Sequence, residues 1–204
     1  MNRLIWSADE TSALLLLVVG VLIGVSAVAV SRRIVGKDGP TRHYVIATAS
    51  SVLFLALVQS WRLDIVLLFA FLLLLALVDV QARRVPNFLI YPALIVAAVG
   101  MVVAPVRPMP HSLIGGLFAF GVFFLTWRIR PGELGGGDVK LAAFLGFVLG
   151  FPSVLWALLV ATLFGVVAIY IQTTRQKQAK FPYAPYLCLG GVVTLLVDPT
   201  MWLF

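Results

Sequence analysis

The chain has 204 residues, of which 62% are hydrophobic, and its mean hydropathy is +1.08. Soluble domains are about 45–50% apolar, so this composition excludes an ordinary soluble domain and indicates an integral membrane protein. The formal net charge of +7 comes from basic residues in short segments between apolar runs, which is the pattern that orients a membrane protein, and we expect no nucleic-acid partner.

The apolar runs predict an all-α fold, a polytopic membrane bundle of about eight transmembrane helices. A helix needs about 20 residues to cross a bilayer, and fewer when it is tilted or shielded. The predicted spans are Ser12–Val30, Tyr44–Ser60, Ile65–Asp79, Phe88–Ala104, Ser112–Trp127, Asp138–Gly150, Ser153–Gln172 and Tyr183–Val197. We interpret the first run as a retained span, because acidic residues precede it, unlike a signal peptide. Residues 1–204 are expected to form a single integral-membrane domain.

Charge predicts the orientation of these spans. With the amino terminus outside, twelve basic residues lie on the inner side of the membrane and three on the outer side, in agreement with the positive-inside rule. The break at Phe151-Pro152 also allows one kinked helix over the sixth and seventh spans, but that would move three basic residues outside. We therefore expect Asp79 and Asp138 at the cytoplasmic boundary.

These two aspartates are the most informative residues of the chain, because an ionisable group in a membrane span is costly and usually functional. A structural role is the alternative for each. Asp79 could form an ion pair with Arg83 at i+4, and Asp138 could cap a helix after Gly135-Gly136-Gly137. Three consecutive glycines nevertheless exceed what a loop needs, and they would let an extended substrate backbone approach closely.

Two carboxyl groups in contact cannot both ionise easily, so together they hold one proton. Aspartic proteolysis uses such a pair: one carboxylate takes a proton from water, and the protonated partner donates to the scissile carbonyl. Asp138 is expected at a helix amino terminus, where the macrodipole favours an anion, and Asp79 near a carboxyl end. We therefore predict that Asp138 is the base and Asp79 the acid.

Three segments resemble the type IV prepilin peptidases, membrane aspartic proteases of the GxGD type. Asp79 with Arg84-Val85-Pro86-Asn87 is similar to the D-x(6)-P-[ND] segment, and Gly135 to Leu141 matches GxGDxKL. Phe181 to Leu187 is similar to a proline-containing segment that opens the last span. The resemblance implies that Asp79 and Asp138 are catalytic. It also implies a substrate-binding role for Gly135, Gly136, Gly137, Pro182 and Pro185. Lys140 matches the motif, and its role stays open, with contact to lipid headgroups as the structural alternative.

The resemblance also implies a prepilin or pilin-like substrate, cut after a glycine on the cytoplasmic side by a multi-pass protein of the cell membrane that contacts the lipid bilayer. Larger family members carry a zinc-binding cysteine-rich insertion between the first two spans and methylate the new amino terminus. The segment Ser31 to His43 is short and has no cysteine. We therefore expect the compact form, with no metal and no cofactor; the oligomeric state stays open.

Three other classes compete with this prediction. Presenilin-like proteases carry Pro-Ala-Leu after GxGD, whereas Pro92-Ala93-Leu94 precedes it here. A proton- or cation-coupled small transporter would also use intramembrane carboxylates, although both aspartates lie at one membrane edge and no inverted repeat is visible. A structural membrane subunit would explain capped helices without chemistry, but not three motifs in the family's order.

Overall fold

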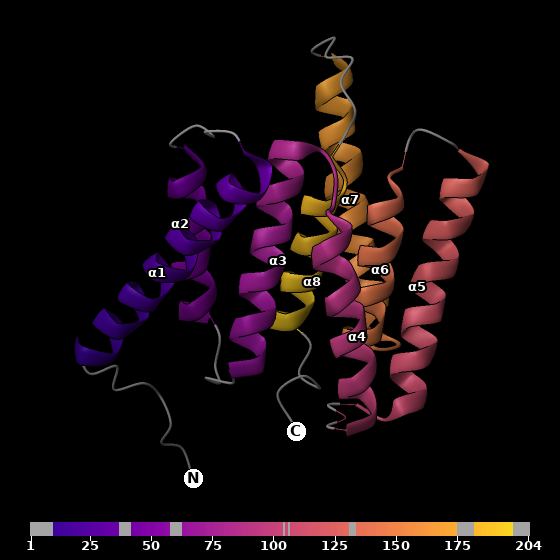
Figure 1. The fold of residues 1–204 in the computed structure, drawn as a ribbon, viewed down its shortest axis with the longest axis horizontal. Helices are drawn as coiled ribbons and strands as arrows, with labels where there is room; N and C mark the ends of the chain where they lie inside the picture. Colours follow the sequence, from indigo (N-terminus) through magenta and orange to yellow (C-terminus); the bar gives the residue numbers. More distant parts are fainter. Residues whose placement is uncertain are drawn as a thin grey trace. The chain divides into compact units, whose positions relative to one another are not determined.

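The structure is a computed structural model that describes residues 10–36, 42–57, 63–103, 105, 107–130, 134–174 and 182–197. Their regular structure consists of helices, which confirms the predicted all-α fold (Figure 1). The helices of the described part are α1 (Glu10–Val35), α2 (Arg42–Leu57), α3 (Leu63–Ala82), α4 (Asn87–Val103), α5 (Met109–Ile129), α6 (Gly136–Leu149), α7 (Ser153–Thr174) and α8 (Ala184–Val197).

Four helices of the described part are long and apolar enough to cross a bilayer: α1 over Val18–Val35, α3, α5 and α7. The apolar segments in α2, α4 and α8 are shorter. The chain is thus a polytopic helical membrane protein, while the figure of eight crossings stays a prediction. The predicted third span is too short, because α3 has 20 residues and continues for three residues beyond Asp79. Residues 58–60, Ala104 and Phe181 of the predicted spans and motifs lie outside the described residues.

The chain divides into two compact units, Met1–Ala70 and Phe71–Phe204, and the single domain expected from the sequence stays a prediction. In the first unit, α1 packs against α2 through small residues. A Cβ added at Gly20 would lie 2.7 Å from the Val52 side chain, and one at Gly24 would lie 2.6 Å from the Thr48 backbone. These glycines therefore allow the two helices to approach closely, as in other membrane bundles.

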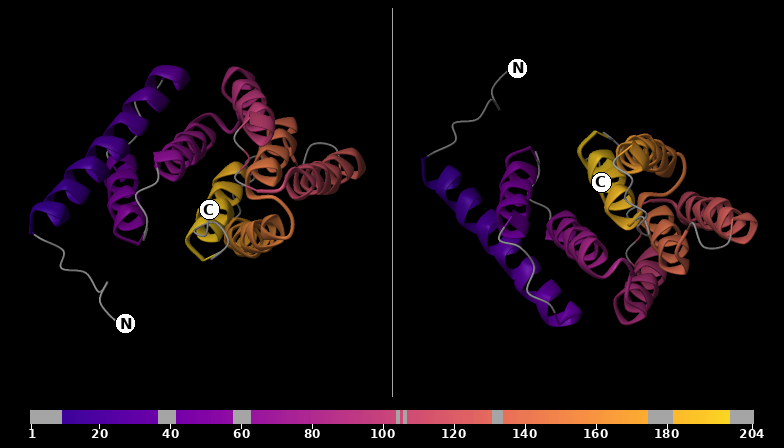
Figure 2. Two further views of the ribbon diagram at one scale, coloured as in Figure 1. Left: turned by 90° about the horizontal axis from the view of Figure 1, so that it is seen from below. Right: turned by 90° about the horizontal axis from the view of Figure 1, so that it is seen from above.

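The second unit contains both aspartates and is arranged around α6. This helix packs against α4, α5, α7 and α8, and Figure 2 shows it between them in two views. Nine of its 14 residues are buried, including Asp138. A helix that is apolar on all sides is expected at the centre of a bundle. Gly115 of α5 and Gly146 of α6 meet backbone to backbone, since a Cβ at either position would collide with the other.

Candidate active site

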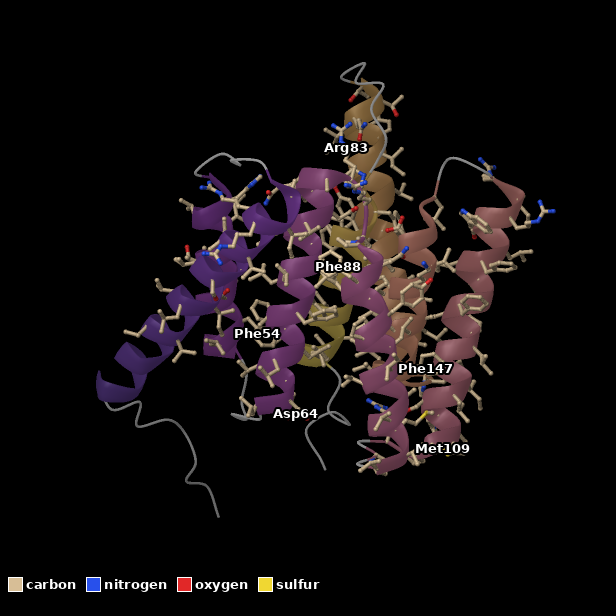
Figure 3. All side chains as sticks on the ribbon, viewed as in Figure 1. Phe54, Asp64, Arg83, Phe88, Met109 and Phe147 are labelled. Carbon is tan, nitrogen blue, oxygen red and sulfur yellow. The ribbon has the colours of Figure 1, made fainter. Side chains whose placement is uncertain are left out.

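Asp79 lies in the last turn of α3 and is only 3% exposed. The helix ends because Arg83 adopts a left-handed conformation with φ 53°, while its N–H donates to the Asp79 carbonyl at 2.7 Å. The Arg83 side chain is exposed at one end of the unit, opposite Met109 (Figure 3). The alternative structural role of Asp79 as the ion-pair partner of Arg83 stays untested.

Asp138 lies in the first turn of α6 and is 7% exposed. Gly135 occupies the N-cap position, and Asp138 is the third helical residue, so the expectation that Asp138 itself caps the helix is wrong. Its side chain turns back instead: the Gly135 N–H donates to Asp138 Oδ2 at 3.0 Å. This is half of a capping box, and it holds one carboxyl oxygen in a fixed direction. Asp79 thus lies in the final turn of its helix and Asp138 in the initial turn of its helix, as the sequence predicted.

The three glycines before Asp138 differ in their surroundings. A Cβ on Gly137 would lie 2.8 Å from Val85 Cβ, whereas a Cβ on Gly136 would meet nothing within 4 Å. Gly135 faces Asp138 itself. Gly137 therefore lets α6 approach the connection between α3 and α4 closely, while the approach of a substrate backbone to this segment stays a prediction. Gly136 is exposed and remains open to a ligand.

Cys188 connects the surroundings of the two aspartates. It is buried in α8, which packs against both aspartate-bearing helices: a Cβ at Gly191 of α8 would lie 2.8 Å from the Leu145 side chain of α6 and 3.3 Å from the Leu72 side chain of α3. Phe71 of α3 and Phe144 of α6 pack edge to face with ring centroids 5.5 Å apart. The helices that carry the two aspartates thus pack against each other and against α8. Sequence reasoning assigned this cysteine no role, because only the packing of α8 places it between these helices.

Tyr183 is a second residue of the site that sequence reasoning missed. Its ring lies beside Gly165 of α7, where a Cβ would be 2.9 Å away, and its hydroxyl is 3.5 Å from Thr162 Oγ1. Tyr183 stands between the two prolines predicted to bind substrate. Pro182 precedes α8 and Pro185 lies in its first turn, where a proline costs no hydrogen bond.

Lys140 also contacts a residue of the first motif. Its ammonium group donates to Asn87 Oδ1 at 2.7 Å and lies 4.5 Å from the centre of the Tyr91 ring. The charged end of Lys140 thus binds the start of α4, while its contact with lipid headgroups stays untested. Among the described residues, no group of three or more His, Cys, Asp or Glu side chains could hold a metal ion. Glu133, which precedes the glycines, lies outside them.

The sequence matches the model of the type IV leader peptidase family over residues 66–170, just over half of the chain. This region contains Asp79, Asn87, Asp138 and Lys140. The chain belongs to this family, as the three motifs predicted.

Curated relatives agree with the family. The chain is 30% identical over 165 residues to the type 4 prepilin-like proteins leader peptide-processing enzyme of Escherichia coli O78:H11, covering 75% of this chain and 60% of that protein. The prepilin leader peptidase/N-methyltransferase of Pseudomonas aeruginosa is 26% identical over 172 residues, which cover 79% of this chain and 59% of that protein. The prepilin leader peptidase/N-methyltransferase of Bacillus subtilis is 27% identical over 135 residues, which cover 64% of this chain and 54% of that protein. The chain thus spans about half to three fifths of the length of these relatives. No solved structure matches.

Proposed function

We propose that this protein is an aspartic endopeptidase that removes the leader of prepilin or pilin-like proteins, with Asp79 and Asp138 as its catalytic pair. One observation carries the proposal: two carboxyl groups, 59 positions apart in the sequence, are both buried, and the helical turn that holds Asp138 lies against the connection that follows Asp79, where Gly137 meets Val85. Buried ionisable groups that converge in a membrane bundle are functional by default. The family and the names of its relatives supply the substrate class.

The proposed chemistry needs only the two side chains and water. Ionised Asp138 takes a proton from a water molecule as its oxygen attacks the scissile carbonyl carbon, and protonated Asp79 donates its proton to the carbonyl oxygen. Collapse of the tetrahedral intermediate breaks the C–N bond, and the leaving nitrogen receives a proton from the pair. The Gly135 N–H that donates to Asp138 Oδ2 supports this assignment, because a hydrogen bond to a carboxylate favours its charged form.

The substrate is proposed to reach the pair from the cytoplasmic face. The positive-inside rule supports this side, since Arg83, Arg84 and Arg128 are exposed beside the helix ends that carry the aspartates. These arginines would repel a basic leader, so their proposed role is to bind lipid headgroups. Gly136 offers the open backbone along which the scissile segment could lie. Substrate contacts by Gly135, Gly137, Pro182 and Pro185 stay predictions.

Cleavage of a tagged prepilin, in cells and with the purified protein in lipid nanodiscs, tests the proposal. The wild type should release a shortened pilin, and Asp79→Asn and Asp138→Asn should each abolish cutting, because neither carboxyl group works alone. Asp64→Asn is the matched control, since it removes an exposed carboxylate at the other end of α3. Thermal unfolding should establish that the variants are folded. A wild type that leaves prepilin uncut, or an Asn variant that still cuts at the wild-type rate, would refute the proposal and favour a transporter or a structural subunit.

A further inference from the structure

We propose that Lys140 is a positioning residue which, through its hydrogen bond to Asn87, sets the distance between Asp79 and Asp138. This inference rests on the proposed function. The bond joins two motifs 53 positions apart in the sequence: Asn87 closes the segment that begins at Asp79, and Lys140 follows Asp138 by two residues.

Few buried apolar side chains hold α4 in place. Of the described residues of α4, only Ile90 is buried, whereas Tyr91 and the residues on the outer faces of the helix are exposed. The Lys140 ammonium group meets this first turn twice, at Asn87 Oδ1 (2.7 Å) and over the Tyr91 ring (4.5 Å). Asn87 and Tyr91 are one turn apart and share a helix face. Lys140 therefore supplies a polar attachment where apolar burial is small.

A second contact holds the same connection. Gly137, one turn before Lys140 on α6, lies against Val85, two residues before Asn87. Residues i and i+3 share a helix face. This face of α6 therefore contacts the α3–α4 connection at two points, through Gly137 and through Lys140. Asp138 is on the turn between those points, and Asp79 lies three residues before α3 ends. A shift of the connection would therefore move Asp79 relative to Asp138.

The cost of a lysine at this position supports a specific role. Side chains on a helix lean toward its amino terminus, where the macrodipole disfavours a cation. The partners that Lys140 has among the described residues, an amide oxygen and an aromatic ring, do not neutralise its charge. An uncharged side chain would suit this partly buried position better if no bond to Asn87 were needed.

Kinetics of prepilin cleavage by Lys140→Met, Asn87→Ala, the double variant and Asn87→Asp test the inference. Lys140→Met and Asn87→Ala should each lower kcat by about tenfold or more and leave KM within about twofold of the wild type, because the pair is displaced while the substrate surface is kept. The double variant should be no slower than the slower single variant. Asn87→Asp keeps an oxygen acceptor for the ammonium group and should retain near wild-type kcat.

Arg128→Met is the matched control, since it removes an exposed cation at the end of α5 and should leave kcat unchanged. The inference is overturned if Lys140→Met cuts at the wild-type rate, if Asn87→Ala is neutral while Lys140→Met is slow, or if Asn87→Asp is as slow as Asn87→Ala. Equal losses in Lys140→Met and Arg128→Met would overturn it in favour of headgroup binding. Failure of the proposed function is distinguishable, because then the wild type itself leaves prepilin uncut.

Discussion

Gly137→Ala should damage catalysis through a single methyl group. The added Cβ would lie 2.8 Å from Val85 Cβ and 3.3 Å from the Val85 carbonyl oxygen. Non-bonded carbons prefer separations of about 3.5–4.0 Å, so α6 and the α3–α4 connection must move apart by roughly 0.7–1.2 Å. A misplacement of about 1 Å can cost about a hundredfold in rate. We expect kcat to fall by about ten- to a hundredfold and stability to fall by about 1–3 kcal/mol.

Gly136→Ala is the matched control on the preceding residue. Its Cβ would meet nothing within 4 Å, and alanine is more favourable than glycine within a helix by up to about 1 kcal/mol. Thermal unfolding in detergent and prepilin cleavage under saturating substrate measure both quantities. Gly136→Ala should be at least as stable as the wild type, and because the substrate is proposed to lie along Gly136, its effect on cleavage should appear in KM and leave kcat unchanged. Equal losses of kcat in the two variants, or a wild-type rate in Gly137→Ala, would show that the contact with Val85 does not set the site.

The remaining predictions concern two further positions. Arg83→Gly should stabilise the protein by about 1 kcal/mol, because the left-handed conformation at φ 53° suits glycine at the end of a helix; a lower Tm would contradict this reading. Gly165→Ala should lower kcat, since its Cβ would lie 2.9 Å from the Tyr183 ring and displace that residue, which stands between the two prolines predicted to bind substrate. Gly121→Ala, with open space around it, should cut like the wild type in the same cleavage assay.

The sequence could predict the helices because the length of an apolar run is a local property. It misplaced their ends where tertiary structure decides. The third span seemed to stop at Asp79 because the apolar run stops there. In the structure, α3 continues to Ala82 and ends where Arg83 turns left-handed, before Pro86. Asp138 seemed to be a cap, whereas the backbone at Gly135 caps the helix and the aspartate turns back onto it.

The contacts around the pair could not be predicted, because they join segments that no local pattern relates. Cys188 lies in an apolar stretch like any other, and only the packing of α8 places it between α3 and α6. The role of Lys140 stayed open because the sequence shows its charge but not its contact with Asn87, which lies 53 positions away. The substrate-binding role was assigned to the two prolines beside Tyr183 and not to Tyr183 itself. Gly165, which makes room for the Tyr183 ring, lies on another helix, so the sequence does not show this contact.

Asp79 and Asp138 are held in place by different kinds of contact, so substitutions around them should differ in their effects. Asp138 belongs to the helix at the centre of its unit, with nine of 14 residues buried, and its carboxyl group is tied to the same helical turn by Gly135. Asp79 lies one turn before Arg83, whose backbone is left-handed. The connection that follows is held to α6 by the contacts of Val85 and Asn87. Close-packed interiors resist displacement, whereas short connections yield more easily. Substitutions that alter the separation of the two carboxyl groups should therefore cluster in residues 83–87 and in the α6 residues that touch them, and less in the buried middle of α6.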